Sequence, residues 1–224
     1  MRSIDHWMIA IISSCVIVTL AILHSSALMW VVAISAILGI LASVFTASGI
    51  WVAYLMDSIS FGIYMYTCYG EKYYGEMVLS GIIIILEICT IIEWIRHKEK
   101  NVVIVNKISK KSWIISLISA IILTIIYALI LYFTGSNLPI LNALGTCVYI
   151  FGVYLAFRRS ILQFVGYLSY EVIFFILWAT TAIQHNYYGF IYLVGGITET
   201  ILLVLGIFNW KKFQREQSQG VIDE

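Results

Sequence analysis

Two stretches of the chain repeat one turn motif: Tyr73–Gly81 is YYGEMVLSG, and Tyr187–Gly195 is YYGFIYLVG. Both follow the pattern Y-Y-G-x-x-x-L-x-G, and the second begins 114 residues after the first. Each copy stands between long apolar segments. A glycine after paired tyrosines suits a tight entry into the following helix. The motif therefore indicates that one helical unit occurs twice in this chain.

The similarity extends beyond the motif at the same offset. Asp57–Ile83 aligns with Glu171–Ile197 without a gap, and nine of the 27 pairs are identical. The first aligned pair, Asp57 and Glu171, matches an acid with an acid, and Tyr64 pairs with Trp178. Acids are rare within apolar segments, so chance matching of apolar residues is a poor explanation. Internal duplication around a central binding site is common in secondary transporters.

The composition is that of a membrane protein. Hydrophobic residues make up 62% of the 224 residues and charged residues 11%, and there is a single proline. A soluble surface needs about a quarter charged residues, so this chain is expected to face lipid. Nucleic-acid binding is excluded, because no basic segment is interleaved with aromatic residues.

Eight segments are long and apolar enough, or nearly so, to cross a bilayer as helices, which takes roughly 20 residues. They are 7–23, 27–47, 50–69, 77–95, 113–133, 138–157, 161–183 and 187–210. Spanning strands are excluded, because an open sheet in lipid would leave backbone groups without hydrogen bonds. We therefore predict an all-α integral membrane protein.

Basic residues lie on alternate loops. The run from Arg96 to Lys111, the pair Arg158-Arg159 and the segment Lys211–Arg215 hold eleven of the thirteen lysines and arginines. Arg2 agrees with this pattern, and Lys72 alone lies on the other side. Since cytoplasmic loops are rich in Lys and Arg, both termini are predicted to be cytoplasmic. A cleaved signal peptide is the alternative for the first span, because Ser25-x-Ala27 resembles a cleavage site.

The repeat offset pairs the third and fourth spans with the seventh and eighth, and hence the second with the sixth. Each unit then has three helices, and the fifth span lets both units point the same way through the membrane. We predict a 3+1+3 parallel-repeat bundle with one additional N-terminal helix. The expected parts are the additional helix at 1–26, repeat one at 27–95, a cytoplasmic loop and linker helix at 96–137, repeat two at 138–212 and a cytoplasmic tail at 213–224.

Over residues 28–212 the chain resembles the PnuC family of bacterial vitamin transporters. The 3+1+3 layout, the paired Y-Y-G turns and the helix ends Glu93-Trp94 and Asn209-Trp210 carry the resemblance. It implies a fold similar to full-length SWEET transporters and a place in the bacterial inner membrane. It also implies inward facilitated diffusion of nicotinamide riboside, which a cytoplasmic kinase then traps.

The chain departs from this family in one pattern. Members that carry nicotinamide riboside typically have W-x-x-W near the start of the seventh span, followed by an asparagine. The corresponding residues here are Phe164-x-x-Tyr167, followed by Glu171. Deoxynucleosides, thiamin and riboflavin, which related members carry, therefore remain alternative substrates.

Five acids lie within the predicted spans or at their ends: Asp57, Glu87, Glu93, Glu171 and Glu199. An ionisable group at bilayer depth is costly unless it is paired, protonated or facing water, and the predicted spans contain no lysine or arginine. Acids that line a polar cavity can bind ribose hydroxyls, amino groups or a cationic ring. Acids that hold helices together are the alternative. Glu93 lies beside Arg96 near a helix end, where an interfacial ion pair is expected.

Aromatic residues share helix faces with these acids. Steps of about three or four residues place Phe164, Tyr167, Glu171 and Trp178 on one face. Such a stripe suits a flat ring that carries a polar sugar, although packing between helices is the alternative. The predicted substrate-binding residues are Tyr54, Asp57, Glu87, Phe164, Tyr167, Glu171, Trp178, Tyr192 and Glu199.

The sequence favours a transporter over an enzyme. It contains no Walker loop, nucleophile elbow or zinc-protease motif, so we expect no catalytic residues, no metal and no cofactor. The expected partners are the lipid bilayer and a small molecule with an aromatic ring and sugar-like polar groups, and a homo-oligomer is compatible with the sequence. A membrane-embedded lipid-modifying enzyme and a binding or sensory subunit that does not transport are the alternatives.

Overall fold

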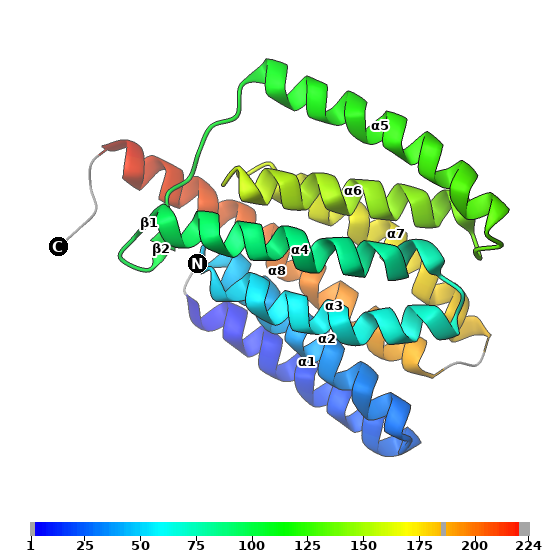
Figure 1. Cartoon of the computed structure of the whole chain (residues 1–224). Helices are drawn as coiled ribbons and strands as arrows, with labels where there is room; N and C mark the ends of the chain where they lie inside the picture. The colour runs from blue at the N-terminus through cyan, green and yellow to red at the C-terminus, as the bar shows by residue number, and fades with distance from the viewer. Residues whose placement is uncertain (1–2, 185–186, 220–224) are drawn as a thin grey trace.

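The computed structural model describes residues 3–184 and 187–219. Over these residues the chain folds into eight helices and one short hairpin, which confirms the predicted all-α class (Figure 1). The elements are α1 (Ser3–His24), α2 (Ala27–Ala47), α3 (Val52–Gly70), α4 (Tyr74–Arg96), β1 (Lys98–Glu99), β2 (Val102–Val103), α5 (Lys110–Phe133), α6 (Pro139–Phe157), α7 (Gln163–Ile183) and α8 (Tyr188–Gln219). Arg2, part of the loop before α8 and the end of the predicted tail lie outside the described residues.

Helix α3 is more polar than its neighbours. Among the described residues, seven helices are long and apolar enough to cross a membrane, and α3 is the one that is not. It has 19 residues, but Asp57, Ser58 and Ser60 and four tyrosines lower its hydropathy. Because α3 packs against both α2 and α4, several of these side chains point into the protein rather than toward lipid. By length and hydropathy, seven of the eight predicted spans are therefore candidate membrane helices, and α3 is the exception.

The chain after α4 is more ordered than a charged loop. Strands β1 and β2 pair antiparallel, with Lys98 opposite Val103. The α8 helix continues to Gln219, through residues that were predicted to begin the tail. The Gln217 side chain accepts from the backbone N–H of Val105 (2.9 Å) and donates to the carbonyl of Val103 (3.1 Å). These hydrogen bonds hold the helix extension against the hairpin segment.

The basic segments gather at one end of the bundle. The backbone N–H of Asn106 donates to the carbonyl of Arg159, and that of Val103 donates to the carbonyl of Gly49. The hairpin, the α6–α7 turn and the end of α8 therefore meet at this end (Figure 1). Lys72 lies at the other end, where its carbonyl accepts from the N–H of Asn137. Positive charge thus separates along the bundle as the alternating loops predict.

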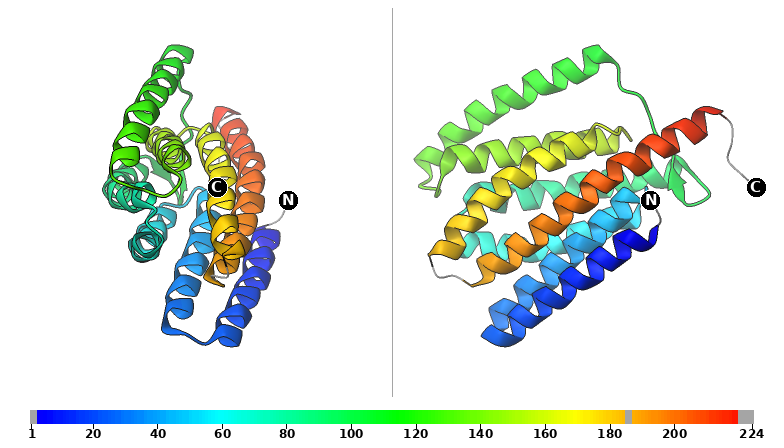
Figure 2. Two further views of the ribbon diagram at one scale, coloured as in Figure 1. Left: turned by 90° about the vertical axis from the view of Figure 1, so that its right-hand side faces the viewer. Right: turned by 180° about the vertical axis from the view of Figure 1, so that it is seen from behind.

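The helices form two groups of three that pack reciprocally. We call α2, α3 and α4 the first unit and α6, α7 and α8 the second unit. Between the units, α2 packs along α8 and α4 packs along α6. Helix α5 lies at the outer edge beside α6, and α1 lies at the opposite edge against α2 and α8 (Figure 1 and Figure 2).

Two tryptophans show the same reciprocity. Trp94 at the end of α4 donates from Nε1 to the carbonyl of Ala156 in α6, at 2.9 Å. Trp210 of α8 donates from Nε1 to the carbonyl of Thr46 in α2, also at 2.9 Å. The two indole rings touch, with centroids 5.4 Å apart. Each unit therefore attaches its third helix to the first helix of the other unit by equivalent side chains.

Candidate functional site

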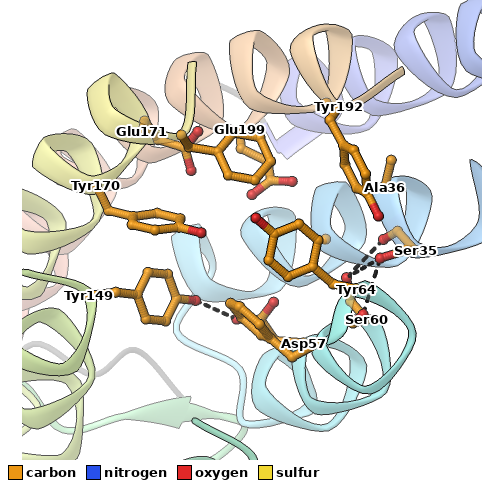
Figure 3. A pocket seen from close by; sticks show the side chains of 14 residues that line it. Ser35, Ala36, Asp57, Ser60, Tyr64, Tyr149, Tyr170, Glu171, Tyr192 and Glu199 are labelled. Atoms are coloured by element: carbon orange, nitrogen blue, oxygen red, sulfur yellow. Dashed lines mark hydrogen bonds between the residues drawn. The ribbon is translucent and has the colours of Figure 1, made fainter. Parts of the chain in front are cut away.

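A cavity of about 50 Å³ lies at the interface of the two units. A second one, of about 30 Å³, shares Asp57, Tyr149, Glu171 and Glu199 with it. Their walls come from helices α2 and α3 of the first unit and α6, α7 and α8 of the second unit. Figure 3 shows the side chains of the larger cavity converging from these helices.

Three of the predicted acids line both cavities: Asp57, Glu171 and Glu199. Asp57 Oδ2 accepts a hydrogen bond from the Tyr149 hydroxyl at 3.0 Å. Glu171 is only 8% exposed, and its Oε2 has no hydrogen-bond partner among the described residues. The Glu199 carboxylate lies against Gly39, where Oε1 would be 2.6 Å from an added Cβ. The site thus collects carboxylates from α3, α7 and α8, and none of the described residues in its walls is basic.

Aromatic rings form most of the remaining wall of the larger cavity. Tyr64 and Tyr192 pack edge to face at a centroid distance of 5.4 Å. Tyr149 and Tyr170 do the same at 4.7 Å, and Tyr170 adjoins Phe174 at 5.7 Å. Rings arranged in this way offer faces to a flat heterocycle and hydroxyls to its polar groups.

Three more of the predicted residues, all of them tyrosines, line the cavities. Tyr192 lines the larger one, and Tyr54 and Tyr167 line the smaller one. The Tyr54 hydroxyl donates to Gln163 Oε1 at 3.1 Å, which joins α3 to α7. Tyr167 packs against Tyr149 with centroids 5.3 Å apart.

Three of the predicted residues lie outside the walls of both cavities. Phe164 is fully buried against Trp210, with centroids 5.6 Å apart. Trp178 stands behind the wall, where it packs on Tyr192 at 4.2 Å and is fully buried. Glu87 is also fully buried, and its Oε2 accepts from the Ser58 hydroxyl at 2.6 Å. Helix periodicity finds the face of each residue but not its depth behind neighbouring side chains.

Glu76 is a buried acid that sequence analysis missed. Its Oε2 accepts from the hydroxyls of Tyr170 (2.7 Å) and Tyr64 (3.3 Å). Its backbone N–H donates to Asn142 Oδ1 at 3.4 Å, and Trp178 Nε1 donates to the Tyr64 hydroxyl at 3.1 Å. This network joins the first unit to the second. The missed signal is its position directly after Y-Y-G, just before the predicted span begins.

The Y-Y-G tyrosines also make contacts between the units. The buried Tyr73 hydroxyl donates to the carbonyl of Leu177 (3.2 Å) and lies 2.9 Å from the Thr181 hydroxyl. Tyr188 donates to the carboxylate of Glu71, in the turn between α3 and α4. Partial burial raises the pKa of Glu71 above its ordinary value. The turns therefore tie the two units together at the end opposite the basic loops.

The predicted pairing of Glu93 with Arg96 is wrong. Glu93 Oε1 lies 3.3 Å from Arg159 Nε and 3.1 Å from His97 Nδ1. Arg96 and Glu93 are three residues apart on α4, and the α6–α7 turn brings Arg159 closer. This ion pair closes the basic end of the bundle and has no part in the cavity.

The donor set of the site suits an organic ligand better than a metal. Within residues 3–184 and 187–219, no group of three His, Cys, Asp or Glu side chains is arranged to hold a metal ion. The cavity offers carboxylates that accept hydrogen bonds from hydroxyl or amino groups, and rings that stack. Carboxylates without basic neighbours also favour a positively charged guest.

Comparisons with known proteins identify the family to which this chain belongs. The model of a family described as "Nicotinamide mononucleotide transporter" matches residues 29–212. A curated protein of Neisseria mucosa, named nicotinamide riboside transporter PnuC, is 25% identical over 196 residues, which cover 84% of this chain and 74% of that protein. A solved structure, described as the crystal structure of the vitamin B3 transporter PnuC, matches with a TM-score of 0.83 and 22% identity, covering 95% of this chain and 92% of the other. At that identity the structural likeness concerns the fold.

Proposed function

Because the chain belongs to the nicotinamide mononucleotide transporter family, we propose that it imports nicotinamide riboside or a similar nucleoside-like vitamin. It is a multi-pass membrane transporter. The observation that carries the substrate proposal is the cavity between the two units, where tyrosines and the acids Asp57, Glu171 and Glu199 meet. The rings stack on the heterocycle, and the acids accept hydrogen bonds from the sugar or attract the positive charge of the ring.

Transport requires the two units to move apart. The cavity of about 50 Å³ holds only a few water molecules, whereas ligand pockets typically occupy about 300–1,000 Å³. At the basic end, Trp94 contacts Trp210, and Tyr54 binds Gln163. At the other end, hydrogen bonds to Glu76 hold the units together. In the proposed mechanism one set of contacts breaks while the other persists, so that the site opens to one side at a time.

The proposal contains no catalytic step. The described residues of the cavity walls include no histidine, cysteine or lysine that could act as a nucleophile or metal ligand. A lipid-modifying enzyme would need a nucleophile beside a general base, or a metal site, at a membrane interface. The acids lie instead between the units, where a carrier holds its substrate. Movement is by facilitated diffusion, with trapping of the substrate after entry.

Thiamin is the second candidate substrate. The observation in its favour is that Phe164 and Tyr167 stand where the W-x-x-W pattern would place tryptophans, and that Glu171 follows in place of the asparagine. A carboxylate suits the aminopyrimidine and thiazolium groups of thiamin, as it suits the pyridinium of nicotinamide riboside. Riboflavin and deoxynucleosides lack a permanent positive charge.

Two measurements on the purified protein test this function. Calorimetric titration with nicotinamide riboside, thiamin, riboflavin and a set of deoxynucleosides identifies the ligand, and we expect nicotinamide riboside or thiamin to bind most tightly. Uptake of that ligand into liposomes that contain only this protein then distinguishes a carrier from a binding subunit. Binding without uptake would contradict the transport proposal, and no binding to any of these compounds would contradict the substrate proposal.

We further propose that the basic end of the bundle faces the cytoplasm and that the protein lies in the bacterial inner membrane. Its loops carry nearly all of the lysines and arginines, as cytoplasmic loops do. A cysteine in place of Ser109, at the start of α5, should then resist an impermeant thiol reagent in intact cells. A cysteine in place of the exposed Thr134, at the other end of α5, should react. The opposite labelling pattern would reverse the orientation.

The internal repeat remains part of the proposal. Superposing the first unit on the second should bring Asp57 onto Glu171, with a rotation axis along the membrane normal. The reciprocal Trp94 and Trp210 contacts support this relation. An axis in the plane of the membrane would contradict it.

A further inference from the structure

The cavity carries more carboxyl groups than a neutral substrate needs. The carboxyl groups of Asp57, Glu171 and Glu199 face one small space from three different helices (Figure 3). Asp57 accepts a hydrogen bond from the Tyr149 hydroxyl at 3.0 Å. Glu171 is more than nine-tenths buried, and its Oε2 has no partner within the described part of the chain.

The described part of the chain supplies no basic side chain to the walls of the two cavities. None of the described residues in the walls of either cavity is a lysine, an arginine or a histidine. Arg159 lies at the basic end of the bundle, where it contacts Glu93 at 3.3 Å. An acid in a low-dielectric interior is either protonated or needs a cation or several hydrogen bonds to stabilise its negative charge, and a cationic ligand supplies that charge.

We propose that this site selects a substrate whose heteroaromatic ring bears a permanent positive charge, a pyridinium or thiazolium, and that Glu171 and Glu199 are the charge-selecting residues. This inference rests on the proposed function and deepens it, because it names the property of the substrate that the site reads. The two glutamates come from α7 and α8 and lie on the same side of the cavity (Figure 3). Asp57, on the opposite side and bound to Tyr149, is assigned to the hydroxyl groups of the ligand.

The aromatic wall supports the same assignment. Tyr64, Tyr170, Phe174 and Tyr192 surround the space that the carboxyl groups face. The face of an aromatic ring attracts a cation, and this attraction is strongest where water is excluded. A cationic ring between these side chains is therefore bound by ring faces and carboxylates at once, whereas a neutral ring of the same shape gains only the stacking.

The test compares two ligands that differ in charge and hardly in shape. Nicotinamide riboside carries a pyridinium, and its reduced form, in which an added hydride makes the ring neutral, is the matched probe. Thiamin and deazathiamin, in which a neutral thiophene replaces the thiazolium, form a second pair. Calorimetric titration should show that the cationic member of at least one pair binds about tenfold or more tightly than its neutral partner.

Variants then assign the selectivity to residues. Glu171→Gln and Glu199→Gln keep the size of the side chain and should reduce the cation preference severalfold, mainly by weakening the cationic ligand. Glu93→Gln removes an acid that contacts Arg159 outside the cavity, and it should leave the preference unchanged. The comparison of ligands on the unaltered protein needs no variant, so the test does not depend on the folding of any one of them.

The outcomes separate this inference from the function on which it rests. Equal affinity for the charged and neutral members of a pair would overturn charge selection and leave the transport proposal standing. A preference that persists unchanged in both Glu171→Gln and Glu199→Gln would overturn the assignment to these residues. Absence of binding by all four ligands would overturn the proposed substrate class together with the inference.

Discussion

Replacing Gly39 with alanine should move a carboxylate of the site without unfolding the protein. Gly39 lies on α2 and faces α8, and an added Cβ would be 2.6 Å from Glu199 Oε1. Ordinary contact begins near 3.4 Å, so the carboxylate must shift by about 0.8 Å. The nearest atom outside Glu199 is Ser60 Oγ, at an ordinary 3.7 Å. Since Glu199 Oε1 is the end of a flexible side chain, the backbone can stay where it is.

The effect on folding should be small. Alanine in a helix is favoured over glycine by about 0.8–1 kcal/mol. Turning the Glu199 side chain away from a preferred rotamer costs roughly 0.5–1.5 kcal/mol. The two effects nearly cancel, so the thermal midpoint should change by only a few degrees, as expected for changes below about 1 kcal/mol.

The effect on ligand binding should be larger. A carboxylate displaced by that distance loses a charge-assisted hydrogen bond or contact with the ligand, which contributes about 1.5–3 kcal/mol. The affinity should therefore fall roughly 10- to 100-fold. Calorimetric titration measures this loss, and thermal unfolding followed by tryptophan fluorescence shows whether the variant is folded.

Gly195→Ala is the matched control. Gly195 also lines the cavity, but its added Cβ would be 3.5 Å from Ala36 Cβ, which is ordinary contact. This variant should bind within about threefold of the original protein, a change below about 1 kcal/mol. A folded Gly39→Ala protein with unchanged affinity would refute the role of Glu199. An equal loss in Gly195→Ala would show that added volume, rather than carboxylate position, controls binding.

Three further predictions follow from the contacts between helices and from the charge of the site. Tyr170→Phe removes a 2.7 Å hydrogen bond to the Glu76 carboxyl and should lower the free energy of unfolding by about 1.5–3 kcal/mol. Tyr192→Phe removes the 3.2 Å hydrogen bond from the Tyr192 hydroxyl to Thr67 and should cost less, about 0.5–1.5 kcal/mol. The reverse order in thermal unfolding would contradict the role of the Glu76 network. Gly166→Ala places a Cβ 2.5 Å from the Gly152 Cα and should destabilise the α6–α7 packing by about 1–3 kcal/mol or more. The control Gly62→Ala, whose added Cβ has nothing within 4 Å, should leave the thermal midpoint nearly unchanged. An equally small change for Gly166→Ala would show that the two helices separate easily. Uptake of a cationic ligand should respond to membrane potential, because about 100 mV, negative inside, adds about 2.3 kcal/mol and favours roughly 50-fold accumulation at equilibrium. Uptake of a neutral ligand should not respond. Liposomes whose potential is set with potassium and valinomycin allow both uptakes to be measured.

Much of the site was predictable because acids in apolar segments are conspicuous. Asp57, Glu171 and Glu199 stand out in the sequence, and all three line the cavity. The repeat offset pairs Tyr64 with Trp178 as equivalent positions, but it does not predict that Trp178 Nε1 donates to the Tyr64 hydroxyl at 3.1 Å across the interface. These acids could be identified from the sequence because a charged residue within a membrane span is rare and costly in lipid.

The remaining side chains depend on how helices pack. Tyr149 and Tyr170 line the cavity, but tyrosines are common in this chain and nothing in their spacing separates them from packing residues. Phe164 and Trp178 share a helix face with Glu171, yet other aromatics cover them. Which of two rings on one face reaches a cavity is decided by contacts across the units, which a single sequence does not contain.

Helix ends were predicted least well where polar residues are held by hydrogen bonds to distant parts of the chain. Glu76 follows the Y-Y-G turn and resembles an interfacial acid, although Tyr170 and Tyr64 bury its carboxyl. The polar segment after Trp210 resembles a tail, but its helix continues because Gln217 binds the backbone beside the hairpin. In both places a hydrogen bond between distant segments decides the structure.

Entrance counterflow in liposomes containing only this protein tests transport through the acid-lined cavity. Vesicles loaded with unlabelled nicotinamide riboside are diluted into a trace of the labelled compound, and a parallel set uses thiamin. A facilitator should accumulate the label transiently above its equilibrium level, and Glu171→Gln should reduce the initial rate about tenfold or more, as loss of a charge-assisted contact predicts. Counterflow that is absent for both ligands, or unchanged in a folded Glu171→Gln protein, would contradict transport through this cavity.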